Sequence, residues 1–229
     1  MRIAIIPARG GSKRIPKKNI IEFCGKPMIA HVIAELKATK LFDEIHVSTD
    51  SEEIADVARA HGGSVPFLRD PAHATDFAPV LSVIKWVVGK YAEDQKKFET
   101  VLMVTPCTPL LEKADFEDAC KKFENTDKKN PMLSVARFPS PIEWALADKN
   151  GVLVANSPEK MLIRSQDLIP TYYDAGLFCF FGEETLAKDE KVATSFMKYE
   201  LPRWKAVDID EVDDLELAKR MFLAMKKNV

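Results

Sequence analysis

The 229-residue sequence lacks the features of membrane proteins, of disulfide-bonded secreted proteins and of metal sites built from cysteine and histidine. No apolar run approaches the roughly 20 residues that a membrane span requires, and the first residues lack the apolar core of a signal peptide. The four cysteines are widely spaced, without a C-x-x-C pair, and the four histidines show no H-x-x-x-H spacing. We therefore expect free thiols in the reducing cytoplasm, with no membrane segment and no disulfides.

An excess of charge of one sign is also missing. The formal net charge is −2, with 30% charged and 46% apolar residues, which is ordinary for a globular protein. This balance argues against a broad nucleic-acid surface, and no aromatic residues interleave with the basic run described below. The length suits a single domain, residues 1–229, that carries at most a small appended lobe.

The densest chemical signal is the stretch 3–19, which reads IAIIPARGGSKRIPKKN. Ile3 to Ile6 has the pattern of a buried strand. Residues 1–21 contain six basic side chains and no acidic one. Gly10 and Gly11 allow the backbone to approach a bulky anion, and the flanking Arg and Lys side chains suit a triphosphate. A solvated basic turn is the alternative reading, because neither G-x-x-x-x-G-K-[ST] nor G-x-G-x-x-G is present.

Strand-like and helix-like segments then alternate to about residue 136. Asp50 and Glu53 resemble a capping box at the start of one helix. The alternation predicts an α/β fold, a three-layer α/β/α mostly parallel sheet with right-handed crossovers. Loops 7–19, 48–51, 69–79 and 105–109 should then share one crevice at the carboxyl ends of the strands. The expected strands are 44–48, 65–68, 100–104 and 132–136, and the expected helices are 28–36, 54–58, 80–91 and 113–124.

The alternation of strand-like and helix-like segments ends near Pro139. Four prolines within 139–173, together with Asn150-Gly151 as a hairpin signal, predict an inserted irregular lobe at 139–180. Leu177–Phe181 reads as a strand that returns to the sheet. We expect a last strand over 205–209 and a closing helix over 215–225.

A second chemical signal is the sequence Asp208-Ile209-Asp210. Alternate residues at the end of a strand point the same way, so both carboxylates should share one face. Two convergent carboxylates suit Mg²⁺, which leaves its other coordination positions to water and phosphate. The alternative is that these acids cap the last helix, a role that Asp213 or Asp214 fits better.

Several motifs along most of the chain resemble the sugar nucleotidyltransferases that activate sialic-acid-like nonulosonates with CTP. Within that family, Pro139–Ile142, Arg164–Leu168 and Tyr173–Gly176 are most similar to pseudaminic acid cytidylyltransferases. Thr105 and Leu111 replace a glutamine and an arginine of the sialic acid enzymes, which counts against N-acetylneuraminate as the substrate. Phe77-Ala78-Pro79 also departs from the small hydroxyl residues common in the family. The remaining matching motifs are residues 3–19, 47–50, 69–71 with Asp76, 106–109 and 207–210.

The resemblance implies a role for each matching residue. Contacts with the nucleotide are implied for Ala8, Arg9, Gly10, Gly11, Lys13, Lys18, Asn19, Arg69 and Asp76. Contacts with the sugar are implied for Thr105, Arg164, Gln166, Tyr173 and Asp174. Mg²⁺ is expected on Asp208 and Asp210, and the catalytic set is Arg9, Lys13, Lys18, Asp208 and Asp210.

The implied reaction joins CTP and an acidic nine-carbon sugar, most closely pseudaminic acid, to give a CMP-sugar and pyrophosphate. The same reaction on legionaminic acid, N-acetylneuraminate or 3-deoxy-manno-octulosonate remains open, as does a nucleotide-binding protein without catalysis. The lobe at 139–180 resembles a dimerisation element, so a homodimer is expected, with neither nucleic acid nor membrane as a partner.

Overall fold

The computed structural model describes residues 1–75, 78–187 and 195–227, and a six-stranded sheet forms its centre. The strand order is β10-β6-β9-β5-β1-β4, and β9 runs antiparallel to both of its neighbours while the other pairings are parallel. The α/β class with a mostly parallel sheet is therefore confirmed. The strands are β1 (Arg2–Pro7), β4 (Glu44–Ser48), β5 (Thr100–Val104), β6 (Met132–Arg137), β9 (Tyr172–Gly182) and β10 (Met197–Glu200).

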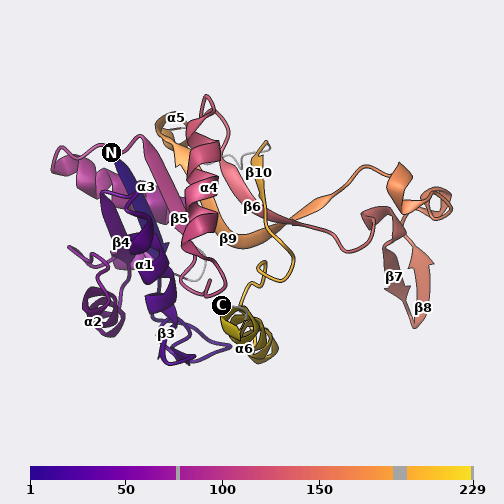
Figure 1. Ribbon diagram of the computed structural model, residues 1–229, viewed down its shortest axis with the longest axis horizontal. Coiled ribbons are helices and arrows are strands. Elements are labelled where there is room, and N and C mark those ends of the chain that lie inside the picture. Colours follow the sequence, from indigo (N-terminus) through magenta and orange to yellow (C-terminus); the bar gives the residue numbers. More distant parts are fainter. Residues whose placement is uncertain (76–77, 188–194, 228–229) are drawn as a thin grey trace.

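Helices pack on both faces of this sheet because β1 is apolar on both of its sides (Figure 1). Ala4 and Ile6 pack with residues of α1, α2 and α4, whereas Ile3 and Ile5 pack with residues of α3 and α5. The helices are α1 (Met28–Thr39), α2 (Glu52–Ala60), α3 (Val80–Glu93), α4 (Lys113–Glu124), α5 (Glu183–Ala187) and α6 (Val212–Lys227). None of the described helices is both long and apolar enough to cross a membrane.

A third apolar cluster lies under α6. Ile209 and Leu215 pack there with Phe23 and Met28, close to the short hairpin of β2 (Glu22–Phe23) and β3 (Lys26–Pro27). Residues near the C-terminus are thus joined to the segment that follows the first strand. This packing fixes the relative position of the two chemical signals of the sequence.

Two predicted strands and one predicted cap are wrong. Residues 65–68 form no strand, and the only pairing nearby is the single bridge between His46 and Ser64, because Pro66 has no N–H to donate. Residues 205–209 lie outside the sheet, since the N–H of Lys205 turns back to the Pro202 carbonyl. Helix α2 is capped by Ser51 and not by Asp50.

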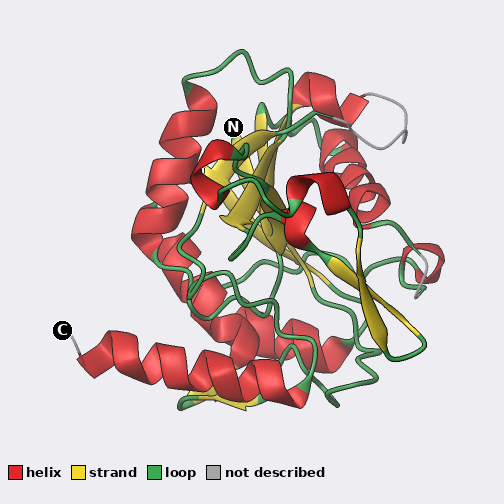
Figure 2. Cartoon of the chain, turned by 90° about the vertical axis from the view of Figure 1, so that its right-hand side faces the viewer, coloured by secondary structure: helices red, strands yellow, loops and turns green. Residues whose placement is uncertain are grey.

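Residues between β6 and β9 form an arm that projects from the body of the molecule (Figure 1, right). The predicted hairpin at Asn150-Gly151 is confirmed, with β7 (Leu146–Lys149) antiparallel to β8 (Val152–Ala155). The view along the arm shows this hairpin in front of the sheet (Figure 2). Three short 3-10 turns complete the arm, at Ile142–Trp144, Pro158–Lys160 and Ser165–Asp167, and a fourth lies in the body at Pro71–His73.

Candidate functional site

The basic loop after β1 is held against the end of β4. The N–H of Ala8 donates to the Ser48 carbonyl at 2.8 Å, and the N–H of Gly10 donates to Asp50 Oδ1 at 2.9 Å. A Cβ atom on Gly10 would lie 3.2 Å from the Cβ of Ser51, so glycine allows this close approach. Asp50 therefore anchors the glycine turn, which is why it is not available to cap α2.

The far side of the loop is fixed by a buried amide. Asn19 is 5% exposed, and its Nδ2 donates to the Arg9 carbonyl at 2.8 Å. The thiol of Cys107, in the loop after β5, donates to Asn19 Oδ1 at 3.6 Å. Burial raises the pKa of Cys107 to about 12, so this side chain stays a neutral thiol near pH 7. The loops after β1, β4 and β5 thus meet at one edge of the sheet, as predicted.

The carboxylate of Asp210 lies against this same basic loop. Lys18 Nζ donates to Asp210 Oδ1 at 2.9 Å and to the Ile209 carbonyl at 2.6 Å, and Arg14 lies 2.9 Å from Asp210 Oδ2. The pKa of Asp210 is lowered, chiefly by the hydrogen bond from Lys18 and then by the charges of Lys18 and Arg14. The basic segment near the N-terminus and the acidic segment near the C-terminus therefore form one site.

Asp208 stands in the opposite electrostatic situation. Its pKa is raised because the surrounding protein partly removes the carboxyl group from water, and because Asp210, Asp214 and Asp174 add negative charge, against the pull of Lys18. The residue remains accessible to solvent, so a ligand can reach it. The shared face of the two carboxylates was predicted from a strand that does not form, and the charge of Asp210 acting on Asp208 is the observation that links them.

Gly176 brings β9 up to Asp208. Its φ is +69°, and a Cβ atom there would lie 2.9 Å from Asp208 Oδ2. Asp174 precedes Gly176 on β9, and its Oδ1 accepts a hydrogen bond from the N–H of Gly176 at 2.8 Å. Asp214 is structural, because its Oδ2 accepts from the N–H groups of Asp210 and Glu211 at 3.0 and 2.8 Å. The carboxylate cluster is thus shaped by a tight backbone approach at Gly176.

Arg69 is buried beside the loop after β4. It is 6% exposed, and its guanidinium donates to the hydroxyl and the carbonyl of Ser48. Burial lowers its pKa to about 10, with Asp50 raising and Arg9 lowering it, so Arg69 remains cationic at neutral pH. Asp76, also predicted to contact the nucleotide, lies outside the described residues.

The structure divides the predicted sugar residues into two groups. Thr105 donates to the Leu177 carbonyl from both N–H and Oγ1, and Tyr173 and Asp174 belong to β9, so these three lie at the edge that carries the carboxylates. Arg164 and Gln166 instead lie on the arm, where Arg164 pairs with Asp167 at 2.8 Å. Within a single chain the arm leads away from the site (Figure 1).

The sequence reasoning missed Arg14, Asp50, Cys107 and Gly176 as parts of the site. Arg14 could have been included, because it lies within the basic run. Asp50 had been interpreted as a helix cap, whereas Cys107 and Gly176 act through contacts with residues distant in sequence. Of the other predicted loop residues, Ala8 is buried, and Gly10, Gly11 and Lys13 are exposed on the turn.

The carboxylates alone do not form a complete metal cage. Among the described residues, no group of three or more His, Cys, Asp or Glu side chains is arranged to hold a metal ion. A Mg²⁺ ion needs only one or two protein carboxylates when a bound phosphate supplies further oxygens. The donor set fits that use, since a divalent cation would relieve the mutual repulsion of Asp208 and Asp210.

Comparisons with known proteins find similar sequences over nearly the whole chain. A family model described as cytidylyltransferase matches residues 3–228. A pseudaminic acid cytidylyltransferase of Campylobacter jejuni is 34% identical over 96% of this chain and 95% of its own. A CMP-N,N'-diacetyllegionaminic acid synthase of Legionella pneumophila is 38% identical over 67% of this chain and 66% of its own.

A solved structure shares the fold. It is a CMP:2-keto-3-deoxy-manno-octonic acid synthetase complexed with CTP, which matches with a TM-score of 0.70 at 16% identity and covers 100% of this chain and 99% of that chain. At this level of identity the match supports the fold alone. The strand order and the placement of the loops are thus those of a known architecture.

Proposed function

This chain belongs to the cytidylyltransferase family, and from that premise we propose that it transfers the cytidylyl group of CTP to pseudaminic acid. The products are a CMP-sugar and pyrophosphate. The observation that carries the proposal is the contact of Asp210 with Lys18 and Arg14, which joins the basic glycine loop to the acidic pair. A triphosphate with its divalent cation has the charge that this arrangement complements.

The reaction is a displacement at phosphorus. The anomeric hydroxyl of the sugar attacks the α-phosphorus, a new P–O bond forms, the bond to the β-phosphate oxygen breaks, and the hydroxyl proton is released. No covalent enzyme intermediate is needed, because catalysis of this type rests on positioning and charge stabilisation. Arg9, Lys13 and Lys18 would hold the triphosphate and stabilise charge on the departing pyrophosphate.

Asp208 and Asp210 are proposed to hold Mg²⁺. Bound there, the ion would polarise the α-phosphate and make the attacking hydroxyl more acidic. Lys18 has a second role in this scheme, because it neutralises Asp210 in the protein alone and can turn to phosphate when a cation takes its place. Asn19 and Arg69 keep the loop in shape through Arg9 and Ser48.

The choice of sugar is supported by the relatives. The C. jejuni protein covers nearly the whole chain, and an N-acylneuraminate cytidylyltransferase of Streptococcus agalactiae is 33% identical over 93% of this chain and 51% of its own. Legionaminic acid, N-acetylneuraminate and 3-deoxy-manno-octulosonate are the rival substrates of the same reaction. Thr105, Tyr173 and Asp174 would contact the sugar within the chain.

A homodimer is part of the proposal. The arm exposes large apolar side chains, with Leu162 95%, Ile169 83% and Val152 63% exposed. Large apolar side chains left exposed on one projecting element are expected to be covered at a protein interface. Arg164 and Gln166, which lie on the arm, would then serve a site only across such an interface.

A pyrophosphate-release screen tests the function. The four acid sugars are each combined with each of the four common nucleoside triphosphates, with Mg²⁺ and with EDTA. We expect release with CTP and pseudaminic acid in Mg²⁺ at a rate that exceeds every other combination. Binding of CTP without release from any sugar would favour a nucleotide-binding protein without catalysis.

A further inference from the structure

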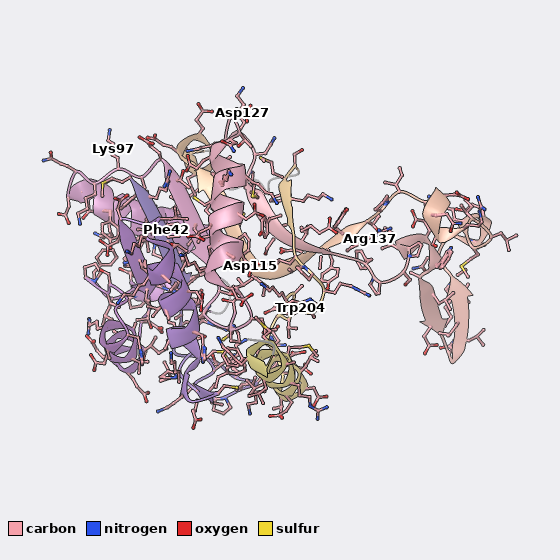
Figure 3. The ribbon with its side chains drawn as sticks, in the orientation of Figure 1. Phe42, Lys97, Asp115, Asp127, Arg137 and Trp204 are labelled. Atoms are coloured by element: carbon pink, nitrogen blue, oxygen red, sulfur yellow. The ribbon has the colours of Figure 1, made fainter. Side chains whose placement is uncertain are left out.

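A cavity of about 300 Å³ opens where the arm leaves the body, and the site described above does not include it. The end of β6, the turn that follows it and the chain returning to β9 form three of its sides, and the segment after β10 closes it. Figure 3 labels Arg137 on the extended ribbon that leads to the arm, and Trp204, the neighbour of Arg203, on the body facing that ribbon. The residues that matter here are Arg137, Phe138, Ser140, Leu168, Thr171 and Arg203.

Two guanidinium groups line this cavity, and among the described residues the only acid on which either is seen to act is Glu200, whose pKa is lowered chiefly by its hydrogen bond with Lys198 and further, from a distance, by the charge of Arg137. Among residues 1–75, 78–187 and 195–227, neither Arg137 nor Arg203 forms an ion pair or a hydrogen bond through its side chain. The acid nearest in the strand pairing, Glu200, is engaged by Lys198 at 3.0 Å. Their N–H donors are therefore available to oxygen acceptors of a ligand.

The rest of the lining is mixed rather than purely cationic. Hydroxyl groups come from Ser140 and Thr171, and apolar surface comes from Phe138 and Leu168. Phe138 is fixed by an edge contact with the Tyr173 ring at 5.2 Å between centroids. An acyl amide suits such a lining, because its carbonyl accepts from guanidinium while its methyl group packs on apolar side chains.

Along β9, the cavity lies about two residues from Asp174 of the carboxylate cluster. In the ladder between β6 and β9, Arg137 pairs with Tyr172 and Val135 pairs with Asp174. Two residues of strand span about 7 Å, a separation that a nine-carbon sugar can bridge. In an acid sugar of this class the carboxylate is bonded to the anomeric carbon. If the anomeric hydroxyl lies at Asp208, the carboxylate lies there too, and the opposite end of the sugar extends toward the cavity.

We propose that this cavity holds the distal, N-acylated end of the acid sugar, with Arg137 and Arg203 donating to the acyl carbonyl oxygens. The inference rests on the proposed function and deepens it, since it names the feature of the sugar that the enzyme reads. Arg137 and Arg203 then determine the specificity for the sugar, and substituting them should leave the nucleotide site unchanged.

The test compares an N-acylated acid sugar that the wild-type protein uses with its de-N-acylated counterpart. Arg203→Ala and Arg137→Ala should each raise the KM for the acylated sugar about tenfold, the usual loss for a hydrogen bond from a charged donor. The KM for CTP should not change, and the preference for the acylated sugar should fall by the same factor. Arg220→Ala, which removes an exposed guanidinium on α6, is the matched control.

Three results would overturn the inference while the function stands. The first is an unchanged KM for the acylated sugar in both variants. The second is an equal rise for the de-N-acylated sugar, which would show general charge attraction only. The third is a change of oligomeric state in sedimentation, which would make the cavity part of a subunit interface. If the wild-type protein releases pyrophosphate with no acid sugar, the function fails and this inference fails with it.

Discussion

Single residues in this site have distinct electrostatic roles. Asp210 is paired with Lys18 and Arg14, which lowers its pKa, whereas the partly desolvated Asp208 faces other carboxylates, which raises its pKa. Lys18 and Arg14 compensate the charge of Asp210, whereas Asp208 keeps a charge that a divalent cation can compensate. The chemistry proposed for the chain depends on this asymmetry.

Removing the Asp210 carboxylate should stop the reaction. Asp210→Ala loses a ligand of the proposed cation and leaves Lys18 without its partner, so turnover should fall at least about a hundredfold, since one such contact contributes on the order of 3 kcal/mol in the transition state. Pyrophosphate release measures this, and circular dichroism checks the fold. Asp213→Ala, at an exposed position of α6, should keep its activity. Undiminished pyrophosphate release by Asp210→Ala would contradict the assignment of Asp210 as a metal ligand.

The raised pKa of Asp208 gives a prediction for stability. A carboxyl group with a raised pKa in the folded state favours folding below its ordinary pKa of about 3.9, and this contribution is lost as pH rises through the folded-state value. At pH 7 the ionised group therefore costs stability. In EDTA, Asp208→Asn should have a higher Tm than the wild type at pH 7, by no more than a few degrees because the residue is solvent-accessible.

The difference in Tm between the two proteins should shrink as pH falls toward 4. Thermal unfolding followed at several pH values measures it. A wild-type protein that is the more stable of the two at pH 7 would show that Asp208 is not repelled by its neighbours.

At the level of elements, the approach of β9 to the segment 208–210 shapes the site. Gly176→Ala would place a methyl group 2.9 Å from Asp208 Oδ2 at a φ of +69°. We expect a loss of about 1 kcal/mol from the left-handed backbone conformation, together with at least a tenfold fall in kcat as the carboxylate shifts. Kinetics and chemical denaturation measure the two effects.

Gly151 supplies the matched control. Its φ is +84° and nothing lies within 4 Å of a Cβ atom there. Gly151→Ala should therefore lose similar stability and keep its kcat. Equal kcat values for the two variants would show that Gly176 does not set the position of the Asp208 carboxylate.

Elements with a strong apolar period could be predicted from sequence, and those set by distant contacts could not. The run Lys113–Glu124 was predicted with its observed bounds, because its apolar positions recur at helical spacing. Residues 205–209 have a strand-like apolar pattern but lie outside the sheet in a turn end and irregular backbone, since the buried Lys205 pairs with Glu112 and Asp115 at 2.7 and 2.6 Å. Those partners lie about 90 positions away in the sequence, beyond the reach of any local pattern.

The same division holds for the site. A basic loop that faces the acidic pair was predicted from charge and from the family resemblance, whereas the direct contact of Lys18 with Asp210 was not predicted. The anchoring of Gly10 by Asp50 was not predicted, because a local helix-cap pattern explained the same residue. Local patterns therefore identified the charged groups and missed the contacts that hold them in place.

For the whole molecule, the arm gives the main prediction. Leu153 is 63% exposed on β8, and a charge there should weaken association through the arm. Leu153→Glu should shift a dimer to a monomer in sedimentation at micromolar concentration, while Lys160→Glu, an exposed charge reversal on the same arm, should not. A wild-type protein that sediments as a monomer would contradict the proposed homodimer.

The central claim is that one magnesium nucleotide lies between the basic loop and the acidic pair, and calorimetric titration of CTP tests it most directly. The wild-type protein should bind CTP at least about tenfold more tightly with Mg²⁺ than with EDTA, because charge-assisted contacts of this kind contribute 1.5–3 kcal/mol. Asp208→Asn with Asp210→Asn should abolish this difference and keep binding in EDTA through the basic loop. A double variant that binds CTP with the full magnesium dependence of the wild type would contradict the account.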